Sequence, residues 1–345
     1  MENNKLQGIT IFRFAAAFYV FIFHLNLRFP IELHHWASKF IENGAAGMTF
    51  FFVLSGFVMA WSSRNGVRSN YLKARIFRIY PAYLVMGLIS LPLIIDVGLS
   101  RIPQSIVLFI SGTQSFIPAS FHLWNFGGSW SVSTELFFYA TFPLLFPIIK
   151  KNPLSALTIS YIASSLIIPF AYTIGGDSAF PYYYVSPIHR LPEFVAGVSI
   201  GVIYSNGGLR IRSAVHKAAG ILFSLILLVF VSTFHNSGYM NCNFSTVLAT
   251  CVLIIVMANI NIKGSFISRS FIYLGKISYS FYLMQIPLLM YVEKFKSILP
   301  QDENLIIWVS LGAFNVLLSA LSFHLIEERF TINKREICKV DREAA

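Results

Sequence analysis

Ionisable side chains inside otherwise apolar stretches are the residues of this chain best placed to do chemistry. The first apolar stretch carries Arg13 and His24, which are 11 residues apart. On a helix this spacing is about 16 Å and close to three turns, so both side chains share one face. An imidazole suits proton transfer near neutral pH. The alternatives are that Arg13 extends to the inner headgroups and that His24 bonds a neighbouring backbone group.

Glu135 is the single charged residue between Arg101 and Lys150. A charged side chain inside a membrane helix costs roughly 3 kcal/mol or more, so such residues are candidate functional sites. Tyr139 follows four residues later, on the same helical face. The hydroxyl cluster of residues 129–134 would cap the helix or bond a sugar. A glutamate near a helix end could also sit among the headgroups.

Two further charged pairs have helical spacing. Arg75 and Arg78 are three residues apart at the mouth of an apolar stretch. Binding of a cytosolic phosphate or pyrophosphate would need such a pair, although part of this cluster is ordinary cytoplasmic charge. Arg190 and Glu193 are also three residues apart and could pair with each other.

The composition is that of a membrane protein. The chain is 56% hydrophobic and 12% charged, and it holds 34 phenylalanines. Soluble domains carry about 25% charged residues. Half that share predicts an all-α polytopic membrane protein in contact with a lipid bilayer.

Apolar windows of about 20 residues predict ten membrane spans. They begin near Thr10, Gly44, Ile79, Ser129, Pro153, Ile188, Ala218, Phe244, Phe271 and Leu305. Residues 103–118, from Pro103 to Pro118, are apolar but short, and we interpret them as one re-entrant or interfacial segment. If they spanned the bilayer, the count would be eleven and the topology after them would invert.

The positive charges favour ten spans with both termini in the cytoplasm. In that arrangement six of the 26 lysines and arginines lie outside and the other 20 inside, as the positive-inside rule requires. The six are Arg28, Lys39, Arg101, Arg190, Lys294 and Lys296. Eleven spans would put the basic clusters after residue 149 on the wrong side.

The chain is expected to form one integral-membrane domain, residues 1–330, and a short charged cytoplasmic tail, residues 331–345. We expect no cleavable signal peptide, because the first span contains Arg13 and His24 and no small-residue cleavage site. Three scattered cysteines give no disulfide framework. The net charge of +11 follows from orientation and anionic lipid, so no nucleic-acid partner is needed. No metal site is expected.

The polar residues are therefore distributed unevenly across the expected membrane. Basic residues lie at the cytoplasmic mouth and a histidine lies within the membrane. Carboxylates with serines and tyrosines are expected at the outer mouth, Glu135 and Glu193 among them. This arrangement suits transfer of a group from a cytosolic phosphorylated donor to an acceptor outside.

Five blocks of sequence resemble the membrane-bound acyltransferase-3 family, the bacterial O-acyltransferases of surface polysaccharides. They occur in the family's order and, with Arg13 and Glu327, extend over nearly the whole chain. The blocks are residues 50–57 (FFFVLSGF), 75–83 (RIFRIYPAY), 130–139 (WSVSTELFFY), 190–197 (RLPEFVAG) and 277–283 (ISYSFYL).

The resemblance implies a ten-helix enzyme of the bacterial inner (cytoplasmic) membrane that uses acetyl-coenzyme A from the cytoplasm as acyl donor and binds no resident cofactor. It implies functional roles for Arg13, His24 and Glu135, and places Arg75 and Arg78 near the coenzyme A phosphates. We take six further residues as candidates for substrate binding: Trp130, Tyr139, Arg190, Glu193, Ser278 and Tyr279.

Two positions depart from the family pattern. Thr49 stands where the family often has an acidic residue, and Gln285 stands where many members have histidine. An acid or a second histidine at these positions is therefore in doubt, and His24 and Glu135 would carry more of the chemistry.

We hypothesise acyl transfer from a thioester to a glycan hydroxyl, with His24 as general base or transient acyl carrier. Glu135 would orient His24 or bind the acceptor, and Arg13 would hold donor phosphate or the developing oxyanion. The alternatives are a transporter of glycans or lipid-linked glycans without group-transfer chemistry, and a scaffold in a polysaccharide assembly complex. The sequence leaves open the acceptor (O-antigen of lipopolysaccharide, capsule, exopolysaccharide, peptidoglycan or a small glycoside), the acyl chain length and the oligomeric state.

Overall fold

The computed structural model describes residues 6–94, 102–118, 129–176, 180–233, 238–262, 265–298 and 304–330. Over these ranges the chain is helical and has no strand, as predicted. The expected tail, residues 331–345, and Arg101 lie outside the described residues.

Ten helices of 16 residues or more stand at the positions of the ten expected spans, within the described part of the chain. They are α1 (Gln7–Arg28), α3 (Gly47–Ser62), α4 (Tyr71–Ile94), α7 (Ser129–Lys151), α8 (Pro153–Gly175), α10 (Pro187–Ser205), α11 (Ala214–Ser232), α13 (Asn243–Ala258), α14 (Phe266–Glu293) and α15 (Asn304–Ser322). The shorter helices are α2 (His35–Glu42), α5 (Ile102–Ser111), α9 (Phe180–Tyr184) and α12 (Gly238–Asn241).

Within the residues that the structure describes, seven candidate spans are long and apolar enough to cross a bilayer. They contain α1, α3 together with α2, α4, α7, α8, α11, and α15 with the π-helical turn η10 (Phe323–Glu327) that follows it. The chain is thus a multi-span helical membrane protein, and the count of ten stays a prediction. Helix α5 has ten residues, about 15 Å of helix, which is too short for a hydrocarbon core of about 30 Å.

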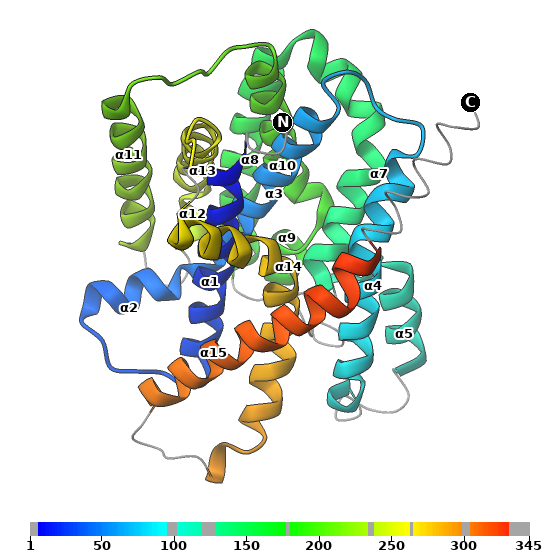
Figure 1. Cartoon of the computed structure of the whole chain (residues 1–345), viewed down its shortest axis with the longest axis vertical. Helices are drawn as coiled ribbons and strands as arrows, with labels where there is room; N and C mark the ends of the chain where they lie inside the picture. Colours follow the sequence, from blue (N-terminus) through cyan, green and yellow to red (C-terminus); the bar gives the residue numbers. More distant parts are fainter. Residues whose placement is uncertain are drawn as a thin grey trace.

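The helices α1 and α14 run in the same direction although they are far apart in the sequence. At one end, the Thr10 backbone lies directly against Gly275. At the other end, Arg28 pairs with Glu293 at 3.3 Å. Between these contacts, apolar side chains of both helices share one cluster. Helix α14 also contacts α4, so it lies between α1 and α4 (Figure 1).

The helices α4 and α14 are parallel as well. The hydroxyls of Tyr279 and Tyr291 donate to the carbonyls of Ile79 and Ile89, at 3.1 and 2.6 Å. Three helices that start in distant parts of the chain therefore point the same way.

Helix α3 forms the middle of the bundle and is packed tightly on α10. A Cβ added at Gly197 would lie 1.9 Å from the Val53 carbonyl oxygen, and one at Gly56 would lie 2.1 Å from the Phe194 oxygen. Glycine is required at these contacts because the two backbones touch. This close approach positions the helix that carries one wall of the site described below.

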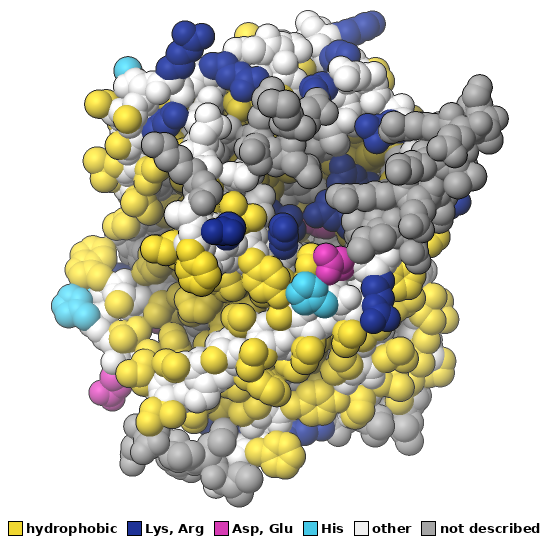
Figure 2. Space-filling model, in the orientation of Figure 1, with side chains coloured by type: hydrophobic (Ala, Val, Ile, Leu, Met, Phe, Trp, Pro, Cys, Tyr) yellow, Lys and Arg dark blue, Asp and Glu magenta, His cyan; other side chains and the backbone are white. Residues whose placement is uncertain are grey.

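The outer surface is apolar where it faces away from the bundle. Lys and Arg gather mostly in the upper part of Figure 2, whereas apolar side chains cover much of the lower face along α15. On α15 these exposed side chains include Phe314, Leu317 and Leu321. Hydrocarbon rather than water is the solvent that suits such a surface.

The α3–α10 contact generates a prediction on stability. We expect Gly197→Ala to lower the thermal unfolding midpoint of the detergent-purified protein, because the new methyl group would force the helices apart at a cost of about 1–3 kcal/mol. The matched control is Gly312→Ala, whose added Cβ meets its nearest neighbour at 3.7 Å. Equal midpoints for the two variants would contradict the proposed close contact.

Candidate functional site

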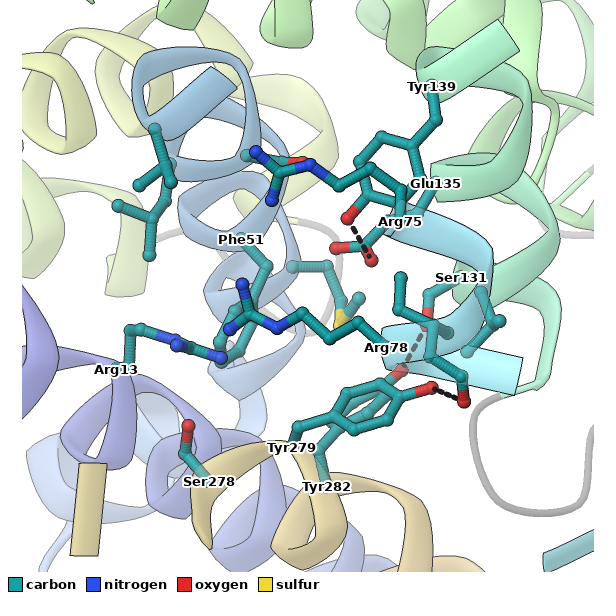
Figure 3. Close-up of a pocket in the computed structure, with 16 residues that line it drawn as sticks. Arg13, Phe51, Arg75, Arg78, Ser131, Glu135, Tyr139, Ser278, Tyr279 and Tyr282 are labelled. Carbon is teal, nitrogen blue, oxygen red and sulfur yellow. Dashed lines mark hydrogen bonds between the residues drawn. The ribbon is translucent and has the colours of Figure 1, made fainter. Parts of the chain in front are cut away.

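Five helices enclose a cavity of about 110 Å³: α1, α3, α4, α7 and α14. Seven of the residues singled out in the sequence line it together (Figure 3): Arg13, Arg75, Arg78, Glu135, Tyr139, Ser278 and Tyr279. These residues are scattered over more than 260 positions of sequence, so the packing of α14 between α1 and α4 is what assembles them.

Antiparallel packing of α4 and α7 brings Glu135 to the arginines. The rings of Tyr71 and Phe142 lie 5.4 Å apart, and one turn further along, the Arg75 guanidinium lies 5.9 Å from the ring centre of Tyr139. The Tyr139 hydroxyl donates to Glu135 at 3.1 Å. The expectation that Glu135 and the arginines lie at opposite mouths is wrong, because successive turns of α4 extend along α7 to the level of the glutamate.

The cavity is rich in positive charge. Arg75 donates to the Ser62 hydroxyl at 3.1 Å. Arg13 and Arg78 make no hydrogen bond and no close ion pair with any residue that the structure describes, and Figure 3 shows the Arg78 side chain extending towards Arg13. Glu135 is the one carboxylate among the described lining residues, so these guanidinium groups are available to an anion.

One side of the cavity is closed by a hydrogen bond between α7 and α14. The hydroxyls of Ser131 and Tyr282 are 2.9 Å apart, and the Phe51 ring lies 6.0 Å from the Tyr282 ring. Tyr282 and Phe51 line the site, but the sequence analysis did not select them as site residues. The spacing of Tyr282 from Tyr279, three residues on one helix, is a signal that could have found it.

His24 lies outside this cavity, further along α1 than Arg13. The polar group next to its imidazole is the carboxamide of Gln285 on α14. Glu135 instead lies in the cavity with the arginines and bonds Tyr139. The structure therefore gives the position beside His24 to Gln285, and the expectation that Glu135 would orient His24 is not supported.

Arg190 and Glu193 form a buried cluster away from the cavity. They are 2% and 0% exposed and pair at 2.7 Å, as their spacing predicts. Arg190 also donates to the Tyr184 carbonyl, while Glu193 accepts from Asn243 and from Thr49, both at 3.3 Å. These bonds tie α3, α10 and α13 together. The predicted role of the pair in substrate binding stays a prediction without support from its position.

Trp130 is a packing residue in this structure. It is 7% exposed and its indole lies between the rings of Phe52 and Tyr184, at centroid distances of 5.9 and 5.1 Å. It supports the cavity wall next to Ser131 but does not line the cavity.

Glu327 is a further charged residue near the site, named above only for the extent of the family resemblance. It lies in the π-helical turn η10, accepts a hydrogen bond from Ser280 and interacts electrostatically with Arg78 and Arg13. A carboxylate just after the last apolar stretch was the available signal, but only the tertiary structure shows which cations it faces.

These features together define a class of protein. A helical membrane bundle contains a cavity lined by arginines and hydroxyl groups, and a histidine lies further along one of the helices that line it. The family comparison agrees: residues 6–324 match the model of an acyltransferase domain. The chain belongs to the acyltransferase-3 family, as its sequence blocks predict.

Two curated relatives carry names that are informative. The chain is 27% identical over 317 residues to the acyltransferase MdmB of Streptomyces mycarofaciens, covering 83% of this chain and 80% of that protein. It is 30% identical over 179 residues to the exopolysaccharide production protein ExoZ of Rhizobium meliloti, covering 48% of this chain and 52% of ExoZ. No solved structure matches the chain.

The buried Arg190–Glu193 cluster generates a prediction. We expect Arg190→Met to destabilise the protein by about 3–5 kcal/mol, because it leaves the Glu193 carboxylate buried without its cation. The double variant Arg190→Met with Glu193→Leu should recover part of this loss. Thermal unfolding of the purified variants in detergent measures both effects, and a double variant less stable than the single one would refute the explanation.

Proposed function

We propose that this protein is a membrane O-acyltransferase that moves an acyl group, most simply acetyl, from cytoplasmic acyl-coenzyme A to a hydroxyl of a glycan. The observation that carries the proposal is the cavity lined by Arg13, Arg75 and Arg78, in which two guanidinium groups lack close partners among the described residues. Coenzyme A presents the phosphates that such a set would bind. Membership of an acyltransferase family supports acyl transfer as the reaction.

The size and position of the cavity suit the narrow part of this donor. A space of about 110 Å³ takes an extended chain but not a whole nucleotide. Arg78 is exposed, so the phosphates would bind at the mouth, while the thioester end would extend along α1 towards His24. Arg13 and His24 are about 16 Å apart along the helix, which sets the distance that the chain must cover.

In the reaction, a neutral nitrogen of His24 removes the proton from the acceptor hydroxyl. The hydroxyl oxygen attacks the thioester carbonyl carbon, the carbon–sulfur bond breaks, and the proton passes to the coenzyme A thiolate. If His24 is first acylated, the carbon–sulfur bond breaks in that step; the acceptor oxygen then displaces the imidazole, and the hydroxyl proton passes to the coenzyme A thiolate. Both routes give one ester and one thiol.

The acceptor would reach His24 from the side opposite the arginines. The name of ExoZ links that relative to an exopolysaccharide, which favours a cell-surface or lipid-linked glycan as the acceptor class here. Tyr139, Ser278 and Tyr279 lie in the cavity with the arginines, so we assign them to the donor side rather than to the glycan.

The proposal places the protein in the bacterial inner membrane with ten spans and both termini in the cytoplasm. The parallel directions of α1, α4 and α14 support it, because spans one, three and nine must run the same way. An extra crossing at residues 103–118 would make α1 and α14 antiparallel. The predicted tail would then lie in the cytoplasm with the basic residues.

We expect His24→Ala to lower O-acetylation by about 10²–10⁴-fold, the usual contribution of a general base, while the protein remains folded. The measurement is the O-acetyl content of the surface glycan by NMR. It compares a deletion strain, the same strain with the wild-type protein restored, and a strain with the variant at equal expression. Equal acetyl signal in all three would exclude that acceptor. If the purified protein also consumed no acetyl-coenzyme A, the transport function without group transfer would replace this proposal.

We expect Arg78→Ala to raise the KM for acetyl-coenzyme A by about 10- to 100-fold, since a charge-assisted hydrogen bond contributes about 1.5–3 kcal/mol. The kcat at saturating donor should change little. The matched control is Arg68→Ala, an exposed arginine of the preceding loop that does not line the cavity. Steady-state kinetics with the purified protein separate the two, and similar KM values for both variants would remove Arg78 from the donor site.

A further inference from the structure

Gln285 is a buried polar residue whose side-chain amide makes no hydrogen bond to the described part of the chain. Its side chain is 0% exposed in the middle of α14. Neither its amide nitrogen nor its carbonyl oxygen has a hydrogen-bond partner in the described part of the chain. Leaving a buried amide unpaired is unfavourable for folding, so such a group calls for an explanation.

His24 on α1 also has a buried polar atom without a hydrogen-bond partner in the described chain. The Nδ1 atom of the imidazole is buried and has no hydrogen-bond partner among the described residues. The contact between α1 and α14 sets the two at one depth: Phe21 and Phe281, about one turn earlier on each helix, have ring centres 5.2 Å apart. This packing places the Gln285 carboxamide beside the imidazole.

The charged groups near His24 and Gln285 either pair with another residue or lie elsewhere. Arg28, one turn beyond His24 on α1, is the charged residue that acts on the imidazole, and it pairs with Glu293 of α14. Glu135 lies in the arginine-lined cavity. Gln285 thus offers His24 a hydrogen-bond acceptor that adds no charge to the membrane interior.

We propose that Gln285 is a positioning residue for His24: its carbonyl oxygen accepts the Nδ1 proton of the imidazole and so keeps Nε2 as the unprotonated nitrogen that meets the acceptor hydroxyl. Which imidazole nitrogen carries the proton is set by the hydrogen bond that the other one makes. A neutral amide fixes the tautomer without favouring the imidazolium, whereas a carboxylate would also stabilise the charged form. The reactive role given to His24 rests on the proposed function, but the pairing itself does not.

The test uses two variants of buried amides. Gln285→Met keeps the length of the side chain and removes the amide. We expect kcat to fall about tenfold or more, with the KM for acetyl-coenzyme A and the unfolding midpoint unchanged, because the lost amide had no other partner. Asn315→Leu is the control: Asn315 is equally buried on α15 and donates to the Phe281 carbonyl at 3.2 Å. It should lose stability and keep its kcat.

A second readout does not depend on activity. Nitrogen-15 NMR of histidine-labelled protein in nanodiscs, with the His24 signals assigned by a His24→Asn spectrum, reports the imidazole tautomer. We expect the wild type to hold the Nδ1–H form and Gln285→Met to shift towards Nε2–H. An unchanged tautomer, or an unchanged kcat in an active enzyme, overturns the inference. A wild type with the expected tautomer but no acyl transfer would instead count against the proposed function.

Discussion

Every polar group in this bundle must find its partner within the protein, because hydrocarbon offers none. Three arginines inside a membrane domain are tolerable only where a cavity admits water or an anion, or where a carboxylate lies near. The packing of α14 between α1 and α4 creates that place. The same contact sets His24 at its depth, so the cation-lined cavity and the histidine are two parts of one helix interface.

The sequence was sufficient for the fold class and for the charged residues of the cavity lining. Apolar windows marked the helices, and the charges that interrupt them marked Arg13, Arg75, Arg78 and Glu135, because a charge in an apolar stretch is conspicuous without any structure. Neutral polar residues do not stand out in the sequence in this way. Gln285 is one amide among many, and only the absence of a partner in the folded chain makes it unusual.

The sequence could not place side chains across helices. Glu135 was expected on the outer side because it follows the start of its helix, but the register of α4 on α7 decides its neighbours. The spacing of Arg190 and Glu193 allowed them to pair, and they do. Their spacing could not show that Thr49 and Asn243 also donate to Glu193. These hydrogen bonds connect α3, α10 and α13.

The parallel pairing of α1 with α14 has a consequence for how the protein is made. About 240 residues of chain separate the two helices, so the first helix leaves the ribosome long before its partner. During that interval the face with Arg13 and His24 lacks the α14 surface that packs against it in the folded protein. The site is thus among the last parts of the molecule to form, and a chain that stops short of α14 holds the histidine but lacks the interface that would make it useful.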